Sequence, residues 1–521
     1  MAKSIFILGC GIMQIPALRL AKQQGWHTAA ADGNPQAPGR SYCDEFFPID
    51  LKDTDALIAA AKTSTSGRGP DGVFTAGTDF SLSTAIIAEA LGLPGHSVEA
   101  ARRATDKTLM RQSFQAAGVP SPPFAELSAG QSIPNTVPGP WVVKPVDSMG
   151  ARGVVRIDSR AELDAALAEA RAFSRSKRAL IESCMEGPEF SLDALVMGDK
   201  IIRCGLADRH IAYPPRFIET GHTIPSNADA ETAEALWELF AQGIRALGLH
   251  WGAAKGDVKL TPQGPMIGEI AARLSGGYMS GWTQPAASGT EPTLGAIRLA
   301  LGLDPGDLLP NRNLVCAERA LIAIDGTVKQ IDGATLPGVI EIFLRCRSGD
   351  KVRFPRNNVE KAGNVLAVGA SHSEAQARAQ AALRALRLEL NPADADTGTY
   401  LDASDAFPPN VFPTGEFFAR LWQSHPPHPS RGCPIKNPSI AIPANLPEHR
   451  DNAGRTMRDI ILLLQNEGRL RVLMDAGTDT NNNGTLGNIT PEQMRSDFWK
   501  ALVRGGMEGL RWYLDRGGAL E

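Results

Sequence analysis

The sequence predicts an α/β protein of several domains with a helical extension after residue 395. Its first hundred residues alternate short apolar, strand-like runs with helical patterns, which is typical of an open parallel sheet. These strand-like runs are residues 4–9, 28–31 and 73–75, and the helical patterns are residues 15–24 and 82–91. From residue 106 helices and strands mix less regularly, and from about residue 314 the pattern becomes β-rich. A chain of 521 residues is long enough for about three or four such domains.

The composition excludes several classes of partner. With 53 basic and 57 acidic residues the formal net charge is −4, so no nucleic-acid partner is expected. The 7 cysteines are scattered and lack C-x-x-C spacing, which favours free thiols in a reducing compartment over disulfides or a zinc site. No secretory signal and no membrane-spanning apolar run is evident. We therefore expect a cytoplasmic protein with no membrane partner.

The glycine-rich start only partly matches a dinucleotide-binding fingerprint. Gly9 and Gly11 follow the first strand, and Asp32 ends the second strand. The fingerprint needs a third glycine where the helix packs closely on the strand, and Gln14 stands there instead. A tight strand-to-helix turn is therefore the favoured interpretation.

Two lysines and a glycine loop predict a site for nucleotide phosphates. Lys107 lies at the head of a helix, and Lys144 ends the apolar strand WVVKP. A single lysine is usually a solvated surface group, but a lysine that closes an apolar strand is costly to bury unpaired. The loop DSMGARG, with Ser148, Gly150 and Gly153, follows at once and offers backbone N–H groups to phosphates. These features would serve the phosphates of a nucleoside triphosphate such as ATP, which also needs a slot for its base, a ribose acceptor and metal-binding carboxylates.

The stretch ALIESCMEGPEF reads as strand, hinge and strand. Backbone groups of Glu182, Ser183, Cys184 and Met185 are candidates for reading the adenine edge, with Met185 packing on the ring. Glu189, beyond the turn, is the candidate acceptor for the ribose hydroxyls. From this stretch alone, an ordinary hairpin with exposed glutamates is the simpler interpretation.

Two carboxylates predict a metal site. Asp257 in KGDVKL and Glu269 in MIGEIAARL lie on strands joined by a short turn, so antiparallel pairing would place them side by side. Like charges at that distance repel unless a cation lies between them, and oxygen ligands suit Mg²⁺, with Mn²⁺ as an alternative. The competing interpretation is two solvent-facing acids.

Taken in order, these features resemble the ATP-grasp superfamily, which includes carbamoyl-phosphate synthetase and biotin carboxylase. Within it, FIETGHTIPS and GEIAARLSGG are most similar to L-amino-acid ligases and related carboxylate–amine ligases. The resemblance implies a three-domain α/β arrangement with a helical tail. Its parts would be a Rossmann-like parallel sheet in residues 1–105, an ATP-grasp domain of two α+β subdomains in 106–310, an α+β domain in 311–395 and a Pro-rich and helical extension in 396–521.

The resemblance also implies an activity. Such an enzyme activates a small-molecule carboxylate as an acyl phosphate and couples it to an amine, releasing ADP and phosphate. Arg273 is the candidate for holding the carboxylate and the acyl phosphate, because its planar guanidinium fork suits both anions. Lys255 is the next candidate for this role. The substrate candidates are Glu219, His222, Ser275, Gly276 and Gly277, and the possible pocket-lining residues are Arg209, Tyr213 and Trp282.

Two alternatives to this activity stay open, and the second of them rests on a departure from the family pattern. Many family members carry a metal-binding asparagine where this chain has Ala271. The alternatives are a carboxylating or carbamoyl-phosphate-type enzyme that activates bicarbonate, and a non-catalytic ATP-binding regulatory protein.

In the extension, residues 479–484 resemble the start of a calcium loop, but Thr490 stands where a bidentate glutamate is needed, so a turn before a capped helix is favoured. We expect the extension to pack on the preceding domains or to make an oligomer contact, as in a homodimer.

Overall fold

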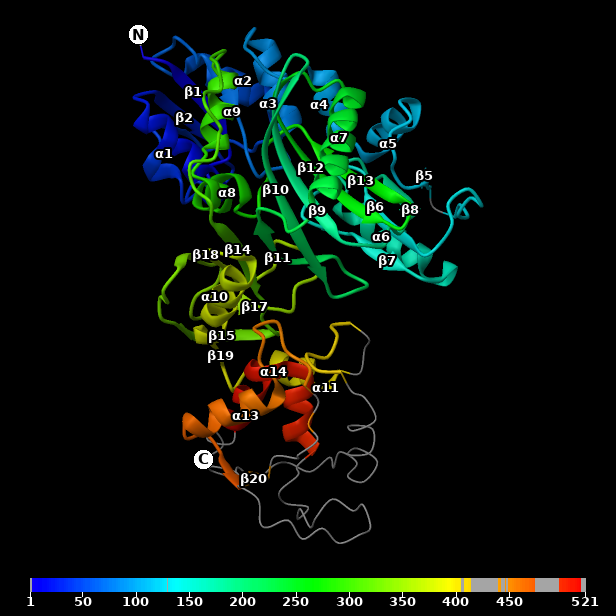
Figure 1. Cartoon of the computed structure of the whole chain (residues 1–521), viewed down its shortest axis with the longest axis vertical. Coiled ribbons are helices and arrows are strands. Elements are labelled where there is room, and N and C mark those ends of the chain that lie inside the picture. Colours follow the sequence, from blue (N-terminus) through cyan, green and yellow to red (C-terminus); the bar gives the residue numbers. More distant parts are fainter. Residues whose placement is uncertain are drawn as a thin grey trace. The chain divides into compact units, whose positions relative to one another are not determined.

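The computed structural model describes residues 2–128, 130–403, 407–413, 439–441, 446, 448–473 and 496–516 (Figure 1). The described chain forms two compact units, one of residues Met1–Glu318 with Leu366–Gln376 and one of Arg319–Val365 with Ala377–Glu521. None of the described helices is long and apolar enough to cross a membrane. The predicted division into four domains stays a prediction.

The first unit begins with a parallel sheet of order β3-β2-β1-β4, as the alternating pattern predicts. Its strands are β1 Ser4–Leu8, β2 His27–Ala31, β3 Glu45–Phe47 and β4 Gly72–Phe74, and its helices are α1 Ile15–Gln23, α2 Thr54–Thr63, α3 Ser81–Ala90 and α4 Val98–Thr105. Gln14 fills the turn after β1, because its side-chain oxygen accepts from the Gly11 N–H at 3.0 Å and its amide donates to the Ala76 carbonyl. The tight-turn interpretation agrees with this geometry.

A second sheet, of order β5-β8-β6-β7, is antiparallel throughout. Its strands are β5 Phe124–Glu126, β6 Trp141–Pro145, β7 Val155–Ile157 and β8 Ala179–Ser183, and its neighbouring helices are α5 Lys107–Ala116 and α6 Leu163–Phe173. The buried residues Leu163, Leu167 and Ala170 of α6 follow helical spacing and pack with Val143 and Ile181 of the sheet.

The third and largest sheet has the order β13-β12-β9-β10-β11, continued by β14 and β18. Its strands are β9 Glu189–Met197, β10 Lys200–Ala212, β11 Ile218–Ile224, β12 Trp251–Thr261, β13 Gly264–Ala271, β14 Val315–Leu321 and β18 Gly363–Gly369. The helix α7 Ala230–Leu247 was not expected from the sequence, although Asp229 caps its start and Gly248, at φ 72°, ends it. Phe240 of α7 packs with Phe114 of α5 in the core.

The chain crosses from the second sheet to the third between β8 and β9. These strands belong to different sheets, so the simple-hairpin interpretation of ALIESCMEGPEF is wrong. Gly187 lies in this crossing at φ 126°, and a Cβ there would stand only 2.0 Å from the Leu260 carbonyl oxygen of β12. Glycine at this position therefore lets the crossing lie directly against the large sheet.

The second unit contains the sheet β17-β15-β19 and the helices of the extension. Its elements are β15 Gly326–Asp332, β16 Val339–Leu344, β17 Lys351–Val352, α10 His372–Ala385, β19 Arg387–Leu390, α11 Ala395–Asp402, β20 Ser439–Ala441, α13 Met457–Asn466, β21 Arg471–Leu473 and α14 Ser496–Arg516; α10 begins in the first unit. The expected helix over 455–473 is shorter, because the chain turns at Gly468, at φ 72°, and then forms β21. The calcium-loop resemblance, Thr490 and most of the Pro-rich stretch lie outside the described residues.

Candidate active site

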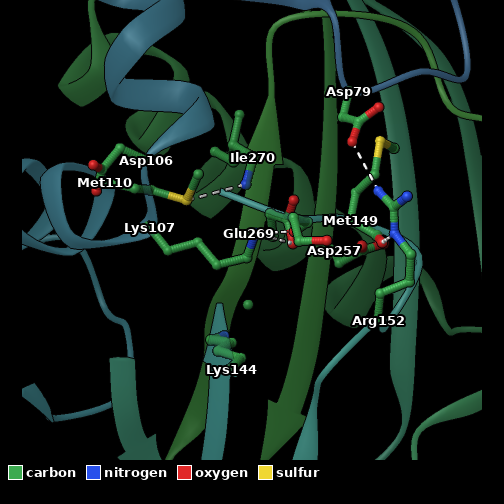
Figure 2. Close-up of polar contacts among 12 residues, drawn as sticks. Asp79, Asp106, Lys107, Met110, Lys144, Met149, Arg152, Asp257, Glu269 and Ile270 are labelled. Carbon is green, nitrogen blue, oxygen red and sulfur yellow. Dashed lines mark hydrogen bonds and ion pairs between the residues drawn. The ribbon is translucent and has the colours of Figure 1, made fainter. Parts of the chain in front are cut away.

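The two predicted phosphate-binding lysines are both buried in the first unit. Lys107 begins α5, and its ammonium donates to the Ser148 carbonyl at 2.7 Å and lies 3.6 Å from a Glu269 carboxylate oxygen. One turn along α5, the Met110 sulfur accepts from the Ile270 N–H at 3.5 Å, which fixes α5 against β13. Figure 2 shows Lys107 pointing toward Glu269 as a result of this packing.

Glu182 holds the second lysine. Its carboxylate pairs with Lys144 through one oxygen and accepts from Arg111 Nε and Nη2 at 3.1 and 3.0 Å through the other. Burial alone raises the pKa of Glu182, but Arg111 and Lys144 bring that pKa below its ordinary value. Arg111 also donates to the Gly268 carbonyl at 2.6 Å, so it links β8 to β13. Sequence reasoning missed Arg111. The Glu182 side chain positions Lys144, and the role of the Glu182 backbone at the adenine edge stays a prediction.

The crossing after β8 has several of its backbone groups engaged. The N–H groups of Ser183 and Cys184 donate to the carbonyls of Pro123 and Pro140 at 3.0 and 2.8 Å. The Met185 carbonyl accepts from Lys259 at 3.2 Å. These contacts leave a base-edge role to other backbone groups of the crossing. The Met185 side chain, the predicted packing partner of the ring, lies over Gly268 of β13.

The two predicted metal ligands face each other across antiparallel strands. Asp257 of β12 pairs in register with Glu269 of β13. Asp257 accepts from Ser191 Oγ at 2.7 Å and pairs with Lys255. Burial alone raises the pKa of both carboxyls, but Asp257 is held below its ordinary pKa by Arg209 and Lys255, and Glu269 by Lys107 and Lys255. Two ionised carboxylates placed this way fit a hard divalent cation.

Arg209 of β10 connects the predicted ribose, substrate and metal residues. It lies 2.5 Å from Glu189, 2.7 Å from Glu219 and 3.0 Å from Asp257. Burial lowers its pKa, but these three carboxylates together raise that pKa well above its ordinary value. Arg209 is thus a permanent positive charge at the centre of the site.

Arg273 is buried and turned toward the parallel sheet. Its Nε donates to the Thr78 carbonyl at 3.0 Å, and its Nη1 donates to the Leu274 carbonyl at 3.1 Å. Burial lowers the pKa of Arg273, and Glu269 is the largest influence that opposes this effect. These contacts orient the guanidinium firmly, and its proposed contact with substrate stays a prediction.

Asp193 of β9, which sequence reasoning missed, anchors the small-residue turn. Its two oxygens accept from the backbone N–H and the hydroxyl of Ser275 at 2.8 and 2.5 Å. Burial raises the pKa of Asp193 to about 6. Next in this turn, a Cβ on Gly277 would lie 3.0 Å from a Glu219 oxygen. The turn 275–277 is therefore held by one carboxylate and flanked by another.

His222 lies in a group with two glutamates, of which Glu318 is buried and Glu219 is half-buried. Its ring nitrogens lie 2.7 Å from Thr283 Oγ1 and 3.3 Å from a Glu318 oxygen. Ligand atoms of Glu219, His222 and Glu318 all lie within 4.8 Å of one another. Sequence reasoning missed Glu318, and it placed His222 as a substrate contact or as a support for Glu219.

Three family models match the chain in the expected order. Residues 20–95 match the ATP-grasp N-terminal domain, residues 137–281 the ATP-grasp domain and residues 319–391 the L-amino acid ligase C-terminal domain 2. A crystal structure of L-amino acid ligase from Bacillus licheniformis superposes with a TM-score of 0.66 at 23% identity, covering 75% of this chain and 99% of that one. This likeness agrees with the predicted fold.

Two curated relatives extend the comparison. An uncharacterised protein of Sinorhizobium fredii is 29% identical over 363 residues, which is 67% of this chain and 74% of that protein. Carnosine synthase 1 of Gallus gallus is 26% identical over 338 residues, which is 60% of this chain. The match spans only 36% of the synthase, so it bears on the shared region alone.

Proposed function

Because the chain belongs to the ATP-grasp superfamily, we propose that it is an ADP-forming ligase that joins a carboxylate to an amine. One observation carries the proposal. A buried lysine, Lys107, lies beside Glu269, and Glu269 is paired across antiparallel strands with Asp257. The second lysine, Lys144, is held by the buried carboxylate of Glu182. Paired cations and carboxylates of this kind suit a nucleoside triphosphate with its metal ion.

The proposed chemistry has two steps. A substrate carboxylate oxygen attacks the γ-phosphorus of ATP, the bond to the β-γ bridging oxygen breaks, and ADP leaves. The amine nitrogen then attacks the acyl-phosphate carbon, phosphate leaves with the bonding electron pair, and the nitrogen loses a proton. Mg²⁺ held by Asp257 and Glu269 would neutralise charge on the transferred phosphoryl group. Lys107 and Lys144 position the phosphates, and most of the catalysis is positioning and charge stabilisation.

The surroundings of Arg273 favour an amino acid among the substrates. Its guanidinium is fixed beside the turn 275–277, where it suits a carboxylate or an acyl phosphate. The group of Glu219, His222 and Glu318 adds two carboxylates, and negative charge there favours a ligand that carries an ammonium group. We therefore place the amino-acid ammonium near Glu219 and Glu318.

Phosphate release across pairs of amino acids tests this function. We expect ATP hydrolysis that requires a divalent ion and both substrates, with a product equal in mass to the two acids less one water. Glu269→Gln should abolish turnover, because it removes a charge from the metal pair and keeps its volume. Glu99→Gln is the matched control, because that glutamate lies on α4 outside the proposed site and is exposed, 3.6 Å from Arg103.

Three outcomes would contradict the proposal. ATP binding without release of phosphate by any pair favours the regulatory alternative. Stimulation by bicarbonate alone favours the carboxylating alternative. Near-normal turnover in Glu269→Gln would show that Glu269 is not an essential metal ligand.

A further inference from the structure

Asp79 is an acidic residue that the proposed reaction leaves without a role. It follows β4 in the parallel sheet, and its Oδ2 receives two guanidinium groups. Arg152 Nη2 and Arg175 Nη2 both lie 2.8 Å from this oxygen. Figure 2 shows the contact between Asp79 and Arg152. A carboxylate shared by two arginines is a specific arrangement, because the three side chains come from separate parts of the chain.

Both arginines belong to the phosphate loop, residues 147–153, or to its support. Arg152 lies in the loop and also donates through Nε to the Met149 carbonyl at 3.0 Å. Arg175 follows α6, and its N–H donates to Asp147, the first residue of the loop, at 3.0 Å. At the far end a Cβ on Gly153 would lie 2.9 Å from the Phe173 ring. Asp79 therefore ties the loop and its support to the segment that follows β4, and the neighbouring Phe80 ring adds a contact with Arg175 at 5.0 Å.

The residue before Asp79 contacts the proposed catalytic arginine. The Thr78 carbonyl accepts from Arg273 Nε at 3.0 Å. Two neighbouring residues thus hold the phosphate loop on one side and Arg273 on the other. A shift of this short segment would change the placement of both.

We propose that Asp79 is a positioning residue that keeps the phosphate loop closed before nucleotide binds. The proposal rests on the proposed function for the identity of the ligand, ATP, but the closure itself is a property of the free protein. A ligand that needs the closed loop binds more weakly in proportion to the fraction of molecules whose loop is open. Asp79 raises the closed fraction by neutralising Arg152 and Arg175 where they meet the parallel sheet.

Nucleotide affinity provides the first test. Asp79→Asn keeps the side-chain size and removes the charge, so the Kd of Mg-ATP measured by calorimetry should rise about three- to tenfold, as expected for two partly exposed ion pairs. Asp158→Asn is the matched control. Asp158 directly follows β7 of the second sheet and also pairs with an arginine, Arg156 at 2.9 Å, but its side chain is exposed. Arg152→Gln removes one of the two ion pairs and should raise the Kd less than Asp79→Asn does. The double variant should bind Mg-ATP no more weakly than Asp79→Asn alone.

Proteolysis of the free protein provides a second test that needs no nucleotide. Cleavage by trypsin after Arg152, identified by mass spectrometry, should be about three- to tenfold faster in Asp79→Asn, because an open loop is accessible. Cleavage after Arg152 should not change in Asp158→Asn. Equal cleavage rates in the wild type and Asp79→Asn, or fully additive effects on Kd, would overturn the proposal. A wild type that binds no ATP would refute the proposed function, and the cleavage rates would still decide the role of Asp79.

Discussion

Removing the carboxylate of Glu182 should strongly destabilise the first unit. Glu182 is 3% exposed and serves two cations, Arg111 at 0% and Lys144 at 8%. Removing one partner of a buried ion pair costs about 3–5 kcal/mol, because it leaves an uncompensated buried charge. Glu182→Ala leaves two such charges, so we expect a loss at the upper end of this range. For a unit of this size the midpoint of unfolding should fall by about 5–15 °C.

The pH dependence gives this prediction a direction. Burial lowers the pKa of Lys144, and Glu182 is the largest influence that opposes this shift. Without Glu182 the pKa of Lys144 falls further below its value in the unfolded chain, so the unfolded state binds more protons. The stability of the variant relative to the wild type should therefore recover as the pH rises from 7 toward 10.

Differential scanning calorimetry of the full chain at several pH values measures both effects. Glu186→Ala is the control, because Glu186 is exposed and should change stability by less than about 0.5 kcal/mol. If the Glu182→Ala midpoint matches that of the control, or if its deficit widens as the pH rises, the assignment of Glu182 as the shared counter-ion is wrong.

Two further variants test other parts of the molecule. Burial raises the pKa of Asp193 to about 6, so the ionisation of Asp193 costs stability as the pH rises through that value. The unfolding midpoint of Asp193→Asn minus that of the wild type, measured by calorimetry, should therefore be larger at pH 7.5 than at pH 5. An equal difference at both pH values would contradict this. Removing residues 396–521 should cause the second unit to unfold or aggregate, because two contacts to the rest of that unit would be lost. Trp512 donates to the Asn391 carbonyl at 3.1 Å, and Arg469 lies 2.7 Å from Glu389 of β19. A truncated protein that light scattering shows to be monomeric and that unfolds cooperatively in calorimetry would contradict this.

Sequence analysis could identify charged residues that stand in an apolar strand of their own. Lys144 and Glu269 stand out because each interrupts an apolar run, and such a charge is buried only with a partner. The short turn between β12 and β13 also suggested that Asp257 and Glu269 face each other, as the strand register shows. In both cases the signal lies within a few residues of the group itself.

Contacts between distant segments were not accessible in the same way. Arg111 and Glu182 lie 71 positions apart, and the sequence of α5 does not indicate which distant carboxylate pairs with its buried arginine. Asp193 is a different case, because the apolar strand SLDALVM around it carries the same signal that identified Glu269. Its partner Ser275, 82 positions away, follows only from the sheet order that places β9 near the turn.

The charges of the site suggest why nucleotide and metal should bind together. Asp257 already contacts Lys255 and Arg209, and Glu269 faces Lys107. A divalent ion bound by the two carboxylates has to compete with these cations, which are held in place by the fold. Phosphates of ATP offer the displaced ammonium groups new anionic partners, so they lower the cost of that exchange. Ala271 of β13 pairs in register with Lys255 of β12, so a positive charge stands beside this position of the metal pair.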